Sequence, residues 1–244
     1  QNSLFVEYQV KTLKMFFKDP YNLIIIDNNI SFDSVDTDML LHICETEKLI
    51  YIKAPSNYYQ NKESFDSSMK LGTTMSWVFN NVAKKRETKY FGILDHDCFL
   101  IKNFSIVPYL DRMGMYGRIC ESVHKPGARN LHVTCNFFRY DLVKDLPMDF
   151  RASHEYQLDT GGANFDVLYK DYNAYAYKLH LITYRYAPQD VNRKDSVQHY
   201  EIIDRVWFHL AASTHDQLVG DGAYKLIYFR GFLDARLNLE TYHI

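Results

Sequence analysis

The stretch that decides the fold is YFGILDHD, residues 90–97. Its first part is a run of apolar and aromatic residues, and the run ends abruptly at Asp95, His96 and Asp97. Such a run predicts a buried strand. Side chains alternate along an extended chain, so we expect Asp95 and Asp97 to point the same way and His96 to point the opposite way.

The two carboxylates at this strand end predict a metal site. Carboxylates a few ångströms apart repel each other unless a cation lies near them. Mn²⁺ and Mg²⁺ take oxygen ligands and usually keep substrate phosphates as further ligands. Asp95 and Asp97 are therefore candidate ligands of Mn²⁺ or Mg²⁺, and the arrangement suits a nucleotide diphosphate held through the metal. The alternative is a pair of helix-capping or loop aspartates.

Helical and strand patterns alternate on the N-terminal side of this motif. We expect a helix from Leu4 to Phe17, a strand at 23–26, a helix at 36–45, a strand at 49–53, a helix at 66–83 and a strand at 90–94. This order predicts an α/β fold with a doubly wound sheet flanked by helices. Ligands bind beyond the carboxyl ends of such strands, so Asp27 and Asp95 are expected to share a site.

The C-terminal half is less regular. We expect strands at 132–140 and 178–184, and helices at 163–170, 201–210 and 223–237. No internal repeat or linker is visible, so we expect a single domain over residues 1–244.

Composition narrows the class of protein. The chain has 244 residues, 47% of them hydrophobic, which supports a full core and argues against disorder. Its 28 basic and 30 acidic residues give no reason to expect nucleic acid as a partner. The 4 cysteines show no CxxC pair, which favours buried thiols in a cytosolic environment. There is no apolar run of about 18 residues, so no transmembrane helix is expected, and no signal peptide is visible.

Several motifs, taken in order, resemble an inverting glycosyltransferase of the GT-A fold, similar to glycosyltransferase family 2. They are LIIIDNNIS at 23–31, SSMKLGTTMSW at 67–77, ILDHD at 93–97, LDTGG at 158–162 and VWFHL at 206–210. The resemblance implies a nucleotide-binding half at 1–103 and an acceptor-binding half at 104–244. It also implies transfer of a sugar, with a UDP-sugar favoured as donor, to a glycan, lipid or protein acceptor. The family's first strand, which contributes to the nucleotide pocket, would precede the point where this sequence begins.

The resemblance also assigns roles in donor binding. Asp27 would bind the base or ribose, because a carboxylate accepts hydrogen bonds from N–H and hydroxyl groups. The alternative for Asp27 is a turn-forming role. Asp95 would lie near the ribose or the metal. Apart from the resemblance, Lys70, Ser67 and Ser68 lie near the start of the third expected helix, whose N-terminus attracts phosphate, although an exposed lysine is usually only a solvated charge.

Two further side chains would complete the chemistry. By resemblance His209 is a third metal ligand, and the alternative is a hydrogen-bonded core histidine. The pair His215-Asp216 competes with it. Asp159 is the candidate base that takes the acceptor's proton, with Glu155 and Asp166 as fallbacks, and its alternative role is a helix cap.

Two other classes of function remain open. A nucleotidyltransferase also binds a metal–nucleotide on a similar sheet, but no glycine-rich phosphate loop is visible. A non-catalytic carbohydrate-binding or interaction module could share the fold, although Asp95, Asp97 and Asp159 argue against it.

Overall fold

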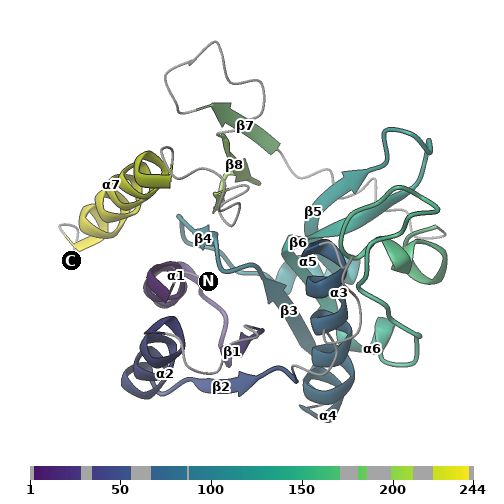
Figure 1. The fold of residues 1–244 in the computed structure, drawn as a ribbon, viewed down its shortest axis with the longest axis horizontal. Helices are drawn as coiled ribbons and strands as arrows, with labels where there is room; N and C mark the ends of the chain where they lie inside the picture. The colour runs from purple at the N-terminus through teal and green to yellow at the C-terminus, as the bar shows by residue number, and fades with distance from the viewer. Residues whose placement is uncertain are drawn as a thin grey trace. The chain divides into compact units, whose positions relative to one another are not determined.

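The computed structural model of the chain describes residues 3–28, 35–55, 67–86, 88–170, 181–185, 199–210 and 222–241 (Figure 1). These residues form a mixed α/β structure with small sheets. The chain divides into two compact units that interleave along the sequence. Unit 1 is Gln1–Asp19, His96–Ser105 and His180–Ile244, and unit 2 is Pro20–Asp95 and Ile106–Leu179. This division differs from the boundary at residues 103 and 104 that the family resemblance implies.

Unit 2 contains two separate sheets. The first is a parallel pair, β1 (Ile24–Asp27) and β2 (Ile50–Lys53), connected through α2 (Val35–Glu47). The second is antiparallel, in the order β3 (Tyr90–Leu94), β6 (Arg129–Arg139) and β5 (Met115–Glu121). The expected βαβ pattern is therefore present in the first pair, whereas β3 joins an antiparallel sheet. Among the described residues no single doubly wound sheet unites these strands.

The core of unit 2 lies between α3 (Ser67–Val78) and the β3-β6-β5 sheet, and Figure 1 shows α3 running across that sheet. A π-helical turn, η2 (Phe79–Ala83), and α4 (Lys84–Arg86) continue α3, so the helix expected at 66–83 is confirmed over its described part. Gly72 allows close packing, because a Cβ there would lie 2.3 Å from the Phe150 carbonyl oxygen. The remaining elements are α5 (Val107–Met113), α6 (Tyr140–Val143), η3 (Gly162–Asn164) and η4 (Phe165–Tyr169).

Unit 1 is built on an antiparallel sheet with two helices. The strand order is β4 (Cys98–Leu100), β9 (Trp207–His209), β8 (His199–Ile203) and β7 (Leu181–Arg185). The helices are α1 (Ser3–Phe16) and α7 (Gly222–Thr241), which the Tyr8 hydroxyl joins by donating to Asp234 Oδ1 at 2.6 Å. Aromatic rings from both helices and from the sheet form the core of this unit; they include Phe5, Phe99, Phe208 and Phe229.

The helix expected at 201–210 is wrong, because this segment forms the β8–β9 hairpin. Asp204 and Arg205 have φ values of 51° and 62°, in the left-handed region, which breaks a helix and closes a tight turn. β-branched and aromatic side chains on either side of the turn favour strands. The strand expected at 132–140 and the helix at 223–237 are confirmed as β6 and α7.

Three features of the structure bear on the expectations from composition: the state of the cysteines, the burial of the aromatic rings and the hydropathy of the helices. All 4 cysteines are free thiols, and Cys44, Cys98 and Cys135 are buried. Most of the largest fully buried side chains are aromatic, which favours a core role for many of the rings. No helix in the described part of the chain combines the length and hydropathy that crossing a membrane requires.

Candidate functional site

The acidic motif at 95–97 forms a turn between two strands. β3 ends at Leu94, and His96 and Asp97 lie in a turn that precedes β4. The alternation expected of an extended chain therefore does not apply to Asp95, His96 and Asp97. Each of these neighbouring residues offers one ligand atom, and the three atoms lie within 4.8 Å of one another. The group has the donor chemistry of a metal site.

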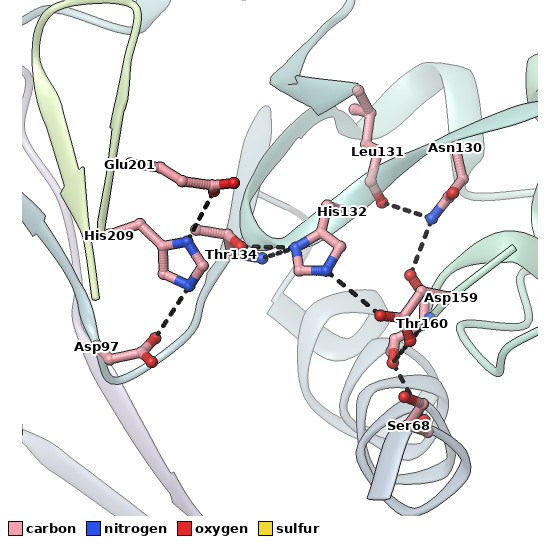
Figure 2. Close-up of polar contacts among 10 residues, drawn as sticks. All are labelled: Ser68, Asp97, Asn130, Leu131, His132, Thr134, Asp159, Thr160, Glu201 and His209. Atoms are coloured by element: carbon pink, nitrogen blue, oxygen red, sulfur yellow. Dashed lines mark hydrogen bonds and ion pairs between the residues drawn. The ribbon is translucent and has the colours of Figure 1, made fainter. Parts of the chain in front are cut away.

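Within unit 1, the structure brings Asp97 and His209 together, as Figure 2 shows. His209 Nε2 lies 3.6 Å from Asp97 Oδ1, and the two side chains are 9% and 6% exposed. Strand pairing sets this distance, because His209 pairs with Cys98 of β4, the residue after Asp97. The Leu210 N–H also donates to the Asp97 carbonyl at 3.0 Å. The two sequence candidates are thus neighbours in the fold.

The spacing of these two atoms suits a shared cation. At 3.6 Å, His209 Nε2 and Asp97 Oδ1 are too far apart for a good hydrogen bond. Nitrogen and oxygen atoms that bind Mg²⁺ or Zn²⁺ lie about 2.0–2.2 Å from the ion. Two ligand atoms of one such ion are therefore roughly 3–4 Å apart. Imidazole and carboxylate are both ligands that Mn²⁺ accepts. The residues present therefore fit a divalent cation.

Glu201 is the third member of this cluster, and the sequence analysis missed it. Its Oε2 lies 3.0 Å from His209 Nδ1, and Glu201 is 4% exposed. β8 places it, since Glu201 pairs directly with His209 of β9. A buried carboxylate needs polar partners, and His209 is one of them. The hairpin that replaces the expected helix therefore creates this contact.

Asp27 lies inside unit 2 and has local partners. Its carboxylate is 0% exposed and accepts hydrogen bonds from Lys53 Nζ and the Tyr51 hydroxyl, each at 2.8 Å. Thr37 of α2 lies within 3.5 Å. Burial and the hydrogen bond to Asp27 raise the pKa of Tyr51. This geometry favours a structural role for Asp27 over nucleoside binding. Its strand, β1, is also not paired with β3, at whose end Asp95 lies.

Asp159 lies in a hydrogen-bonded turn of unit 2. Its Oδ1 accepts the Thr160 N–H at 2.7 Å, and its Oδ2 lies 3.5 Å from His132 Nε2. Hydrogen bonds from His132 first, then from Ser68 and the Thr160 N–H, lower the pKa of Asp159 against the opposing effect of burial. The carboxylate is therefore ionised at neutral pH. It is a weak proton acceptor for the same reason.

The capping alternative for Asp159 is not what the structure shows. The short helix that follows has Gly161 as its N-cap, with φ 93° and no side-chain cap hydrogen bond. The turn instead contacts the first turn of α3, where Thr160 Oγ1 donates to the Ser68 carbonyl at 3.2 Å. Asp159 thus faces the N-terminal end of α3 rather than starting a helix of its own.

His132, from β6, is a second histidine that sequence reasoning did not find. Its Nδ1 accepts the Thr134 N–H at 3.3 Å and lies 2.6 Å from Thr134 Oγ1 (Figure 2). A neutral ring that accepts at Nδ1 carries its hydrogen on Nε2, which faces Asp159. His132 therefore holds one orientation of the Asp159 carboxylate. An alternation of polar residues along the apolar β6 strand, His132 and Thr134, was the available signal.

Three further candidates, Lys70, Glu155 and Asp166, belong to unit 2. Lys70 of α3 is half-buried, and Glu155 is exposed. Asp166 accepts a hydrogen bond from the Tyr156 hydroxyl at 2.7 Å. The Ser67 side chain, His215 and Asp216 lie outside the described part of the chain.

Comparison with known proteins gives no relative. No family model, curated protein or solved structure matches the chain significantly. The resemblance to glycosyltransferases therefore stays a prediction.

Proposed function

We propose that this chain is a metal-dependent glycosyltransferase that moves a sugar from a nucleotide-diphosphate donor to an acceptor hydroxyl with inversion. The observation that carries the proposal is the 3.6 Å approach of Asp97 Oδ1 to His209 Nε2 in a buried setting. Both residues were candidates for the Mn²⁺ or Mg²⁺ site, and they come from distant parts of the sequence. The motifs supply the reaction class, with a UDP-sugar as the favoured donor.

The proposed chemistry assigns a task to each residue. Asp97 and His209 would hold the cation, and Asp95, two residues before Asp97, would be a further ligand or a contact to the ribose. When bound, the cation neutralises charge on the departing diphosphate. The acceptor oxygen forms a bond to the anomeric carbon as the bond from that carbon to the diphosphate oxygen breaks. The acceptor's proton passes to a carboxylate, for which Asp159 is the candidate, and the nucleoside diphosphate leaves.

Metal-dependent donor hydrolysis and ligand-induced thermal stabilisation test this function together. We expect UDP plus Mn²⁺ to raise the melting temperature more than either alone, because each completes the other's site. Asp97→Asn and His209→Ala should each lower Mn²⁺-dependent cleavage of the donor roughly 100-fold or more, since a metal contributes several kcal/mol to such a transition state. The matched control is Asp141→Asn, an aspartate whose side chain is 62% exposed.

Other outcomes would identify another class of protein. Release of pyrophosphate from a nucleoside triphosphate, without cleavage of nucleotide sugars, would indicate a nucleotidyltransferase. No response to UDP, to Mn²⁺ or to both together would favour a non-catalytic module. Unchanged donor cleavage in Asp97→Asn would reject the metal role.

A further inference from the structure

Three adjacent strands of unit 1 place three ionisable side chains in a row. Asp97 precedes β4, His209 ends β9 and Glu201 lies in β8. Glu201 Oε2 contacts His209 Nδ1 at 3.0 Å, and Asp97 Oδ1 faces Nε2 of the same ring at 3.6 Å. The side chains of Asp97, His209 and Glu201 are all at least nine-tenths buried. The imidazole thus lies between two carboxylates, one at each ring nitrogen (Figure 2).

We infer that Glu201 is a positioning residue that orients His209 for metal binding and does not itself bind that cation. The inference rests on the proposed metal site. The two nitrogens of an imidazole point away from each other, so a cation at Nε2, beside Asp97, lies on the far side of the ring from Glu201. Glu201 is therefore placed to accept the Nδ1 hydrogen. It acts on the metal only through the ring.

The two distances decide which nitrogen carries the hydrogen of a neutral ring. The contact of Glu201 with Nδ1 has hydrogen-bond length, whereas the separation of Asp97 from Nε2 does not. The hydrogen belongs on Nδ1, and the Nε2 lone pair faces the Asp97 carboxylate. Two electron-rich atoms that face each other in a buried place are stable with a cation between them. Without Glu201, the hydrogen could move to Nε2, point at Asp97 and block the metal.

Pairing with His209 also helps to compensate the burial of the Glu201 carboxylate. A buried carboxylate without a partner is strongly unfavourable. A carboxylate behind a ligand histidine fixes the ring orientation and makes the nitrogen more basic, and losing such a partner typically weakens metal affinity 10–100-fold. The contact therefore predicts a measurable effect on metal affinity in the absence of any donor.

The test is Mn²⁺ affinity, measured from the electron paramagnetic resonance signal of free Mn²⁺ during titration of the full chain. We expect Glu201→Ala to bind Mn²⁺ about 10–100-fold more weakly. Glu201→Gln keeps an oxygen that accepts the Nδ1 hydrogen, so it should lose only a few-fold. The control is Glu45→Ala, an exposed glutamate of α2 in the other unit, which should match the wild type.

The possible outcomes separate the inference from the proposed function. Wild-type affinity in Glu201→Ala would overturn the positioning role. Equal, large losses in Glu201→Gln and Glu201→Ala would identify Glu201 as a ligand and also overturn it. If the wild type and Glu45→Ala bind no Mn²⁺, the proposed metal site itself fails. If Glu201→Ala does not fold, Glu201→Asp replaces it, because the shorter side chain withdraws the carboxylate from Nδ1 of His209. We then expect Glu201→Asp to bind Mn²⁺ at least tenfold more weakly, whereas Glu201→Gln should lose only a few-fold.

Discussion

The ion pair of Lys53 and Asp27 gives a prediction that separates a structural role from a nucleoside-binding role. Lys53→Met removes the ammonium group 2.8 Å from a carboxylate that is 0% exposed. Breaking a buried pair from one side costs about 3–5 kcal/mol, because the remaining charge stays buried. Asp27 keeps the Tyr51 hydroxyl at 2.8 Å. We therefore expect the free energy of unfolding to fall by about 3 kcal/mol.

A double-mutant cycle makes this estimate measurable. A loss of 3 kcal/mol corresponds to a drop of roughly 6–12 °C in melting temperature for a chain of this size. Asp27→Asn keeps an oxygen for Tyr51 but loses the charge, and it should cost about 2 kcal/mol. In the double variant, Lys53→Met with Asp27→Asn, both charges are gone. Its loss should be smaller than the sum of the two single losses by about 1–3 kcal/mol.

The matched control is Lys89→Met. Its ion pair with Asp111 has a similar length, 2.9 Å, but side-chain exposures of 66% and 48%. Exposed pairs contribute little, so the melting temperature should stay close to that of the wild type. The reasoning is refuted if Lys53→Met and Asp27→Asn leave the melting temperature unchanged. If Asp27→Asn then abolishes binding of UDP, Asp27 has the nucleoside role that the sequence suggested.

Two more predictions concern unit 2. The pKa of Asp159 is lowered in the fold, so the contribution of this carboxylate to stability is present above the unfolded carboxyl pKa of about 3.9 and is lost as the pH falls further. The difference in melting temperature between the wild type and Asp159→Asn should therefore be constant from pH 7 to about pH 5 and should disappear below about pH 4. A difference that disappears near neutral pH instead would contradict this. At pH 7, Asp159→Asn should abolish transfer to the acceptor while donor affinity stays, and normal turnover would place the base elsewhere. Gly72→Ala should destabilise the fold by about 1–3 kcal/mol, because its Cβ would lie 2.3 Å from the Phe150 carbonyl oxygen. The control Gly231→Ala in α7, where nothing lies within 4 Å, should stabilise by about 0.5–1 kcal/mol in thermal unfolding, and equal behaviour of the two would disprove the packing argument.

Local pattern was sufficient for most individual elements of the first half. The spacing of apolar residues predicted α1, and the run Leu23–Ile26 predicted β1, since both signals depend only on neighbouring residues. Sheet membership was not predictable in the same way. The sequence of β3 resembles that of β1, since both are apolar runs followed closely by an aspartate, yet β3 pairs with β6, a strand about 40 residues further along the chain. The partner of β3 lies far along the chain, so the sequence of β3 alone does not identify it.

The role of Asp27 also could not be predicted from neighbouring residues alone. The sequence placed a carboxylate at a strand end, which is correct. Whether that carboxylate meets a ligand or a neighbouring lysine depends on the register of β2. The parallel register pairs Asp27 directly with Lys53, so the charge is neutralised within the sheet. A carboxylate at a strand end is therefore a candidate for binding only until its paired neighbour is known.

The segment at 201–210 explains why the contact of Glu201 with His209 could not be found from the pattern. Its apolar residues fit a helix as well as two short strands, and the helical interpretation hides the contact. Glu201 and His209 are eight residues apart, which in a helix would separate them by about 12 Å along the axis. In the hairpin they are paired across neighbouring strands. The left-handed turn at Asp204 and Arg205 is thus what brings a carboxylate behind the histidine, and with it the orientation of the ring toward Asp97.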